Sequence, residues 1–411
     1  MRSQSTFSLR ALCVVAAVAP ILACEPNAGP SRLTAPLVAS RSAATQELAS
    51  PVWQGIEAHL VAQANLAAVV STRAYSLLGV AQYLAVQRAE GSGRDGRSRD
   101  GSDAGAVAGA SVIVLSYLFP SQAQALEDTV KAQRGAGPGF ARGEVIGRAV
   151  GAEIVARAQA DGFSTPFTRT IPVGAGFWVS NTTPATVAGG PLPGVRPWFL
   201  RSASQFRPGP PPAFGSRDFL AGLAEIRHIS DTRTAEQIAI ATFWAQGVGT
   251  PTTAAFWLQI ATDGIQSHRL SERQATHLYA LLSASMFDAQ IGCWDAKETY
   301  WFIRPWQADP GITVVAAVGK PNHPSYPSGH SCISSSAAAV LTTFFPEQRR
   351  ELDAMVTEAG LSRMYGGIHY RFDIEAGQQL GRSVARFTMR ADRSGRSVLT
   401  PDTHHEHHGG R

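Results

Sequence analysis

Three segments between Lys297 and Asp373 decide the fold of this chain. They read KETYWFIRP at 297–305, HPSYPSGHSC at 323–332 and SRMYGGIHYRFD at 362–373. Each joins a cation or a histidine to a proline or glycine of the kind that begins or ends a helix. The chain around them is patterned for helices, so these segments are expected to lie at helix ends.

The first segment carries two cations, Lys297 and Arg304, seven residues apart. At 100° per residue, seven positions come within about 20° of two full turns. The sequence therefore predicts both cations on one face of a helix that Pro305 ends. A solvated surface stripe would be the plainer interpretation, but the intervening run at 300–303 (YWFI) is strongly apolar.

The second segment has the pattern of a helix start. Pro327 and Ser328 are typical of the first positions, so the backbone N–H groups from Ser328 to His330 would face an anion. Gly329 allows that anion to approach the backbone closely. A capped helix beside a core histidine explains the same pattern, so this segment alone leaves both interpretations open.

The third segment supplies a histidine with a carboxylate four residues later. Gly366 and Gly367 are expected to end one element, and another begins near His369. Asp373 would then accept the N–H of His369 and determine which ring nitrogen is free. With Arg363 as a third cation, the segments predict a site for a tetrahedral oxyanion. No cysteine or carboxylate cluster suggests a divalent metal, so a histidine is the expected nucleophile or ligand.

The motifs K-x6-RP, PSGH and SR-x5-H-x3-D, in this order, resemble the signature of a known superfamily. It joins vanadium-dependent haloperoxidases to acid phosphatases of the type 2 phosphatidic acid phosphatase kind. The motifs span 297–373, and the helical N-terminal block and the Pro-rich segment also resemble bacterial haloperoxidase-like members. The resemblance implies an enzyme with an all-α fold, a helical bundle with two four-helix-bundle-like halves.

The resemblance also implies roles for residues of this chain. His369 would bind the centre of the oxyanion, which is the vanadium of orthovanadate or the phosphorus of a phosphate ester, and Asp373 would orient it. His330 would be the acid–base residue. The oxygens of the bound group would be held by Lys297, Arg304, Arg363, Ser328 and Gly329.

Two activities remain open on this basis. In the first, bound vanadate takes up hydrogen peroxide and, with Lys297 as activator, oxidises a halide to hypohalous acid. In the second, His369 attacks phosphorus, His330 protonates the leaving alcohol, and water hydrolyses the phosphohistidine. A lipid phosphatase is disfavoured, because in those members of the superfamily the motifs lie in membrane helices that this sequence lacks. A non-catalytic surface protein with a relic pocket is disfavoured as well, because every catalytic position is filled.

Three features favour the haloperoxidase. Without a leader of 23 residues, the chain of about 388 residues is longer than the small acid phosphatases of the superfamily usually are. His323 stands where bromide-oxidising members carry histidine, and Trp294 stands where chloroperoxidases have a tryptophan. Simple pocket packing is the alternative explanation of His323 and Trp294. We expect a bromide-oxidising enzyme whose partners are small molecules: hydrogen peroxide, a halide and an oxyanion.

Outside these segments, residues 51–160 and 234–392 are patterned as two helical bundles. The uncharged run 104–126 is interrupted by polar residues and Pro120, so it is expected to be a buried core helix, not a membrane span. Residues 161–233 form a Pro-rich crossover or site wall, because 10 of the 25 prolines fall within 161–215. The excess of glycine is expected in the connections. The Asp spacing of 91–105 faintly suggests a calcium loop, but a flexible loop fits better.

The N-terminus has the features of an export signal. A basic start and an apolar run up to residue 23 predict a signal peptide, and Cys24 resembles the lipidated cysteine of a bacterial lipobox. An ordinary signal peptide with an incidental cysteine is the alternative. Residues 24–50 read as a tether, and a periplasmic or cell-surface location follows, with Cys24 as the expected membrane anchor.

Export leaves Cys293 and Cys332 as a candidate disulfide or as two buried thiols. Residues 393–411 form a His-containing polar tail that is either disordered or a binder of a stray transition metal.

Composition excludes several other classes. Apolar residues make up 44% of the chain and charged residues 16%, which excludes a disordered polyelectrolyte. A mean hydropathy of −0.04 is too low for a protein with many membrane spans. The net charge of +5 is too small and too diffuse to indicate a nucleic-acid partner.

Overall fold

The computed structural model describes residues 48–91, 101–134, 139–395 and 397–400, which belong to one compact unit. Several predictions fall outside the described residues. They concern the leader with Cys24, most of the tether, most of the loop expected at 91–105, and the end of the tail. Within them the chain is helical, and the one β-type contact is an isolated bridge between Phe177 and Phe302. The predicted all-α fold is confirmed.

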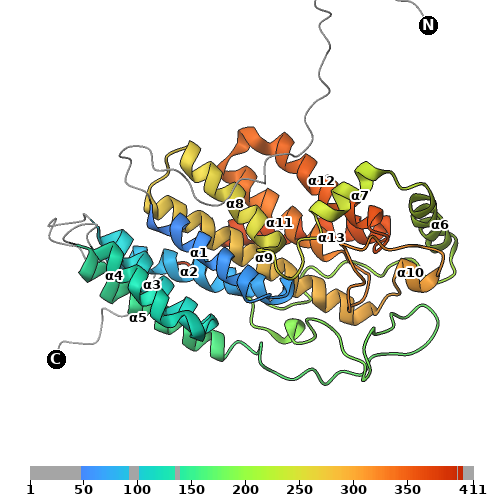
Figure 1. Cartoon of the computed structure of the whole chain (residues 1–411), viewed down its shortest axis with the longest axis horizontal. Helices are drawn as coiled ribbons and strands as arrows, with labels where there is room; N and C mark the ends of the chain where they lie inside the picture. The colour runs from blue at the N-terminus through green and yellow to red at the C-terminus, as the bar shows by residue number, and fades with distance from the viewer. Residues whose placement is uncertain (1–47, 92–100, 135–138, 396, 401–411) are drawn as a thin grey trace, which may run out of the picture. The chain divides into compact units, whose positions relative to one another are not determined.

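Five helices precede the Pro-rich segment and eight follow its irregular part (Figure 1). The first group is α1 (Ala49–Gln63), α2 (Ala68–Gly91), α3 (Ser102–Leu118), α4 (Ala123–Gln133) and α5 (Phe140–Gln159). The second is α6 (Arg217–Thr232), α7 (Ala235–Phe243), α8 (Thr252–Ser267), α9 (Glu272–Tyr300), α10 (Pro305–Ala308), α11 (Gly329–Phe344), α12 (Arg349–Tyr365) and α13 (Arg371–Arg393). The long helix α9 packs against α2 of the first group and against α11 and α13 of the second, so it joins the two.

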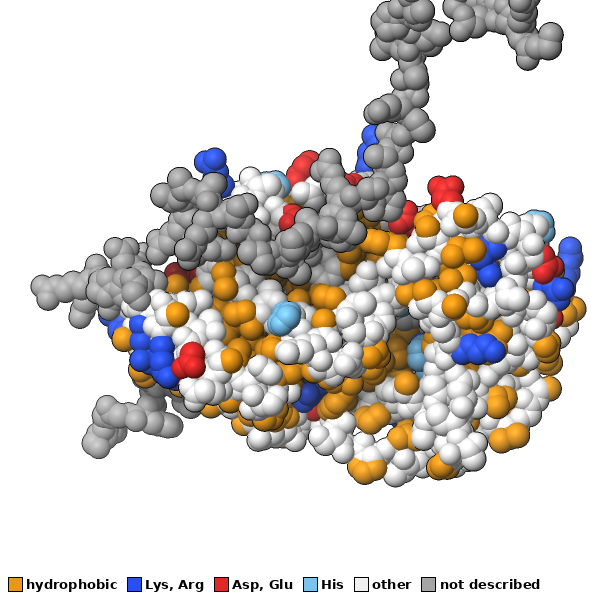
Figure 2. Space-filling view, viewed as in Figure 1, with side chains coloured by type: hydrophobic (Ala, Val, Ile, Leu, Met, Phe, Trp, Pro, Cys, Tyr) orange, Lys and Arg blue, Asp and Glu red, His pale blue; other side chains and the backbone are white. Residues whose placement is uncertain are grey.

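The uncharged run 104–126 forms most of α3, whose residues are largely buried in the core. The helix ends at Leu118, just before Pro120, which has no N–H to continue the backbone ladder. No helix in the described part of the chain is both long enough and apolar enough to cross a membrane. The expected buried core helix is therefore confirmed. On the surface, Figure 2 shows apolar side chains across the middle of one face of the molecule, with most charged side chains near its rim.

Helices α3 and α5 pack backbone against backbone. A Cβ atom added at Gly105, Gly109, Gly143 or Gly147 would lie between 1.9 and 2.2 Å from a backbone oxygen of the facing helix. These glycines are therefore required by helix packing, because no side chain fits. The expectation that the glycine excess belongs to the connections was wrong for this pair of helices.

The Pro-rich segment crosses the molecule as an irregular chain. Residues 161–216 contain a single 3₁₀ turn, Leu192–Gly194, and α6 occupies most of the rest of the predicted crossover. The buried carboxylate of Asp288 on α9 anchors it by accepting the N–H groups of Trp198, Phe199 and Leu200 at 2.7 to 3.0 Å. This anchor holds the segment beside the C-terminal half of α9, where the sequence places the candidate site.

Replacing the anchor should destabilise the whole unit. We expect Asp288→Ala to lower the free energy of unfolding by about 3 kcal/mol or more, since three N–H groups lose their acceptor. The measurement is chemical denaturation followed by circular dichroism. The matched control is Asp263→Ala, which removes an exposed carboxylate from α8. Equal stability of the two variants would contradict the anchoring role.

Candidate active site

Lys297 and Arg304 do not share a helix. Lys297 lies in the last turn of α9, which ends at Tyr300 because Trp301 adopts a left-handed conformation with φ of 47°. The next residues pair with the crossover: Trp178 N–H donates to Trp301 O at 2.7 Å, and Ile303 N–H donates to Gly176 O at 3.0 Å. The helix over 297–304 that the spacing of the two cations predicts was therefore wrong, since residues 301–303 leave α9 and pair with the crossover.

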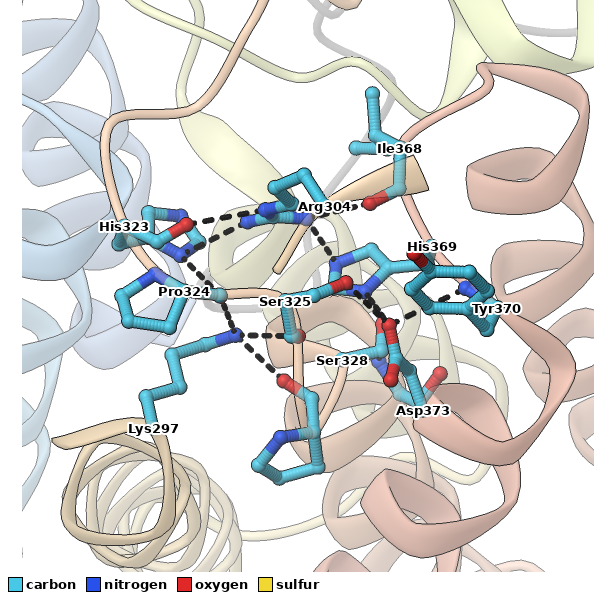
Figure 3. A network of polar contacts seen from close by, with 12 residues as sticks. Lys297, Arg304, His323, Pro324, Ser325, Ser328, Ile368, His369, Tyr370 and Asp373 are labelled. Atoms are coloured by element: carbon cyan, nitrogen blue, oxygen red, sulfur yellow. Dashed lines mark hydrogen bonds and ion pairs between the residues drawn. The ribbon is translucent and has the colours of Figure 1, made fainter. Parts of the chain in front are cut away.

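Arg304 instead precedes α10, and Pro305 is the first residue of that helix rather than the end of α9. Both cations still reach the second segment (Figure 3). Lys297 Nζ donates to the carbonyl oxygens of Pro324, Ser325 and Pro327 at 2.6 to 2.9 Å. Arg304 donates from Nε to His323 O and from Nη2 to His323 Nδ1, each at 3.0 Å.

His369 and Asp373 form the predicted contact. His369 lies just before α13, and its Nδ1 is 2.8 Å from Asp373 Oδ2. The same carboxylate oxygen accepts from Ser325 Oγ at 2.6 Å. Arg304 Nη1 lies 3.0 Å from His369 Nε2. Because a guanidinium can only donate, Nε2 is the acceptor, and the imidazole carries its proton on Nδ1.

The second segment begins a helix as predicted. Ser328 is the N-cap of α11, and its Oγ accepts the Ser331 N–H at 3.4 Å. The first backbone bond of the helix runs from Cys332 N–H to Ser328 O, so the amides of Gly329 and His330 precede it. An anion beside them would be stabilised by the positive end of the helix.

The other two predicted residues, His330 and Arg363, are held by the end of α7. His330 Nε2 lies 2.8 Å from Trp244 O and 3.2 Å from Thr253 Oγ1. Arg363 Nη2 donates to Ala241 O at 2.9 Å. No sequence pattern marks these partners, because they are two backbone carbonyls and one ordinary threonine far away along the chain.

The cluster has an excess of buried positive charge. Lys297, Arg304 and Arg363 are buried, and Asp373 is the carboxylate that faces Lys297 and Arg304. Burial lowers the pKa of Lys297 to about 8 and also lowers the pKa of both arginines. An unbalanced buried charge of this kind is costly until an anion neutralises it, so the residues present fit a tetrahedral oxyanion such as vanadate or phosphate.

The histidines are suited to neutral roles. Burial, together with the neighbouring cations, holds the pKa of His369, His330 and His323 well below the usual range. Burial raises the pKa of Asp373 to about 6, so at pH 7 the carboxylate remains an acceptor for the His369 N–H. A neutral imidazole with Nε2 unprotonated can act as a ligand or as a nucleophile.

Three residues of the cluster are half-buried, His323, Gly329 and His330, and the side of the cluster on which they lie is called its entrance below. The Trp294 ring lies 5.0 Å from that of His323, and its Nε1 donates to Ala188 O of the crossover at 2.8 Å. All ten residues proposed for the site from the sequence therefore lie on the elements that meet here. The crossover was expected as a possible site wall, and Ala188 is the contact through which it reaches Trp294.

Cys293 and Cys332 are buried free thiols, so no disulfide joins α9 to α11. Cys293 Sγ donates to Pro327 O at 3.7 Å, the carbonyl that also accepts from Lys297. Of the two alternatives left open by the sequence, the structure has the pair of thiols.

Comparison with known proteins agrees with this geometry. The model of the PAP2 superfamily matches residues 276–395, which include all three segments. This part of the chain, residues 276–395, belongs to the PAP2 superfamily. Solved structures that share the fold include one described as the first bacterial vanadium-dependent iodoperoxidase, with a TM-score of 0.72, 23% identity and coverage of 83% of this chain and 95% of that one. Another is a holo-type bacterial vanadium-dependent chloroperoxidase, with a TM-score of 0.62, 14% identity and coverage of 78% of this chain and 92% of that one.

Curated proteins that are similar to this chain in sequence include non-specific acid phosphatases. A non-specific acid phosphatase of Providencia stuartii is 31% identical over 175 residues, 41% of this chain. One of Salmonella typhi is 42% identical over 57 residues, 14% of this chain. The chain spans 66% of the length of the first and 23% of the second, less than two thirds of each.

The low pKa of Lys297 predicts a pH-dependent affinity for anions. Lys297 is charged below about pH 8 and loses its charge above it, so sulfate, whose own charge is constant there, should bind less tightly as the pH rises. We expect the affinity to fall by up to about tenfold per pH unit above this point. Calorimetric titration with sulfate from pH 6 to 10 measures it.

Two variants control for other titrating groups. Lys297→Met should weaken binding at pH 7 and flatten the pH dependence, whereas Lys320→Met, which removes an exposed lysine, should leave both unchanged. Sulfate affinity that is constant up to pH 10 in the unmodified protein would rule out this role of Lys297.

Proposed function

We propose that this protein is a vanadate-dependent haloperoxidase that oxidises a halide, preferably bromide, with hydrogen peroxide to hypohalous acid. The observation that carries the proposal is the position of His323 at the entrance to the cation cluster. Its Nδ1 lies 3.0 Å from Arg304 Nη2, which can only donate, and 3.3 Å from Pro324 O, which can only accept, so the shorter contact favours a ring proton on Nε2. The His323 ring lies 5.0 Å from the Trp294 ring, and the Lys297 ammonium lies 5.7 Å from the centroid of that same indole. An N–H donor beside an indole and a buried cation suits a small anion.

In this proposal the residues of the cluster hold vanadate. His369 would bind the vanadium through Nε2, and Asp373 would keep the ring proton on Nδ1. Lys297, Arg304, Arg363, Ser328 Oγ and the Gly329 amide would hold the oxygens. Vanadate supplies the metal centre at which peroxide is activated and the halide is oxidised.

The surrounding residues orient reactants and move protons. His330 is neutral near pH 7 and half-buried, so it would accept a proton from incoming peroxide and return it to a departing oxygen. Trp294 and His323 would bind the halide beside the oxyanion. The buried positive charge would favour the more anionic state of the bound group.

The alternative is an acid phosphatase. Its support is that the curated relatives of the chain include acid phosphatases and that His369, neutral and oriented by Asp373, is equally suited to attack phosphorus. His330 would then protonate the leaving alcohol. The two activities would use the same cluster, because vanadate resembles phosphate in shape and charge. Five-coordinate vanadate also resembles the transition state of phosphoryl transfer.

A paired assay separates the two. Purified protein, freed of bound anions, should brominate a phenol indicator with peroxide and bromide after addition of orthovanadate and show no bromination without it. We expect His369→Ala to lower this activity by at least about 10³-fold. The control is His228→Ala, an exposed histidine of α6. Hydrolysis of a phosphate ester without any vanadate-dependent bromination would overturn the proposal in favour of the phosphatase.

The role of His323 can be tested separately. His323→Phe removes the N–H donor, so kcat/KM for bromide should fall by about tenfold, which corresponds to one hydrogen bond to an anion. Orthovanadate affinity and any phosphate-ester hydrolysis should change by less than about threefold, since His369 and the three cations remain. An equal loss in halide oxidation and vanadate binding would assign His323 to positioning Arg304 alone.

Export to the periplasm or cell surface, with Cys24 as lipid anchor, completes the proposal. The reagents of a haloperoxidase are small and diffusible, so such a location would not restrict their access.

A further inference from the structure

The ring of His330 is held from outside the three motifs, by the connection between α7 and α8. Its Nε2 lies 2.8 Å from the carbonyl oxygen of Trp244, the residue that follows α7. A carbonyl oxygen can only accept, so Nε2 carries a proton. Thr253 Oγ1, 3.2 Å from the same nitrogen, is then a second acceptor for that proton.

The hydroxyl that makes this contact is itself well fixed. Thr253 is buried in the first turn of α8, directly after Thr252. Thr252 is a β-branched residue with φ of 72°, a conformation that such residues rarely adopt. Its Oγ1 is hydrogen-bonded to Ser71 Oγ of α2 at 2.8 Å, and the Pro251 carbonyl accepts from Tyr75 OH at 2.7 Å. These two hydrogen bonds attach the start of α8 to α2. They offset the backbone strain at Thr252 and so hold Thr253 in place.

The short helix α7, which ends just before Trp244, positions a second member of the cluster. Ala241, in the last turn of α7, accepts from Arg363 Nη2 at 2.9 Å. Carbonyl groups in the last turn of a helix lack intrahelical partners, so they are available to cations and to imidazole N–H groups. The end of α7 and the α7–α8 connection therefore orient Arg363 and His330, respectively.

We propose that Thr253 is a positioning residue for His330: with the carbonyl of Trp244 it keeps the ring proton on Nε2 and leaves Nδ1 to exchange a proton with the group bound in the site. Nδ1 of His330 has no hydrogen-bond partner among the described residues. The charged groups around the ring are Arg363, Arg304 and Lys297, all of which favour the neutral form. This inference rests on the proposed function, since it concerns His330 as the acid–base residue.

The test compares Thr253→Val, Thr253→Ser and the control Thr262→Val in the full-length protein. Valine keeps the shape of threonine and removes the acceptor, so kcat should fall by about tenfold for whichever reaction the protein catalyses. KM and orthovanadate affinity should change by less than about twofold. Serine should restore most of the loss. Thr262 lies further along α8 and bonds Tyr279, so its variant should keep the original kcat.

The second readout needs no turnover. Nitrogen NMR of protein labelled at histidine, with His330→Gln for assignment, should show the Nε2–H tautomer in the unmodified protein. In Thr253→Val the Trp244 carbonyl remains as an acceptor, so a minor Nδ1–H population should appear beside the Nε2–H tautomer. The pH profile of kcat should shift in Thr253→Val and return in Thr253→Ser, which a merely structural role would not produce.

The outcomes are distinguishable from failure of the proposed function. A protein without either activity, but with the Nε2–H tautomer and with a minor Nδ1–H population in Thr253→Val only, would refute the function and keep the positioning role. An Nδ1–H tautomer in the unmodified protein would overturn the inference. An unchanged kcat and pH profile in folded Thr253→Val would overturn it as well.

Discussion

The burial of three cations in a cluster with one carboxylate, which faces two of them, is the constraint on which the structure depends. Lys297, Arg304 and Arg363 are removed from water, and the charge of Asp373 balances only part of theirs. Transfer of a charge into the interior is costly unless hydrogen bonds replace its water. Here backbone carbonyls fill that role: three surround Lys297 Nζ, and others accept from Arg304 and Arg363. These dipoles keep the cations in place while the excess positive charge is left for an anion.

That requirement explains why the site is built from helix ends. Carbonyl and amide groups are free only where a helix begins or ends, or in irregular chain. The site accordingly lies where α9 and α12 end, where α11 and α13 begin, and beside the end of α7. The irregular loop 323–327 supplies the carbonyls for Lys297, and the N-terminus of α11 supplies amides. One group of helix ends thus offers acceptors to the cations and donors to the anion.

The crossover and the α7–α8 connection form a layer behind the residues that would contact the bound group. Asp288 holds the crossover against α9, and the crossover in turn holds the Trp294 indole and the chain around Trp301. Thr253 and Trp244 hold His330 in a comparable way. Groups in this layer do not touch the anion, but they determine the tautomers and orientations on which its chemistry depends.

The sequence by itself determined the helical class, the residues of the cluster and most helix ends near it. Pro327–Ser328 and Gly366–Gly367 were sufficient to predict the helix ends, because helix starts and stops depend on the chemistry of nearby residues in the sequence. It did not determine that Arg304 leaves α9, since the apolar run 301–303 fits a helix as well as it fits a buried irregular chain. Only tertiary structure decided that question, through the pairing of this run with the crossover.

The partners of the site were also decided by tertiary structure alone. His330 meets Thr253 and Trp244 across 77 and 86 residues of sequence, and Trp294 meets Ala188 across 106. Two of these partners are backbone carbonyls, which every residue possesses, so side-chain identity cannot mark them. The role of the glycines of α3 and α5 could not be predicted from the sequence either, because it depends on close contact with a facing helix. Residue types state which chemistry is available, and long-range packing decides which atoms are brought together to perform it.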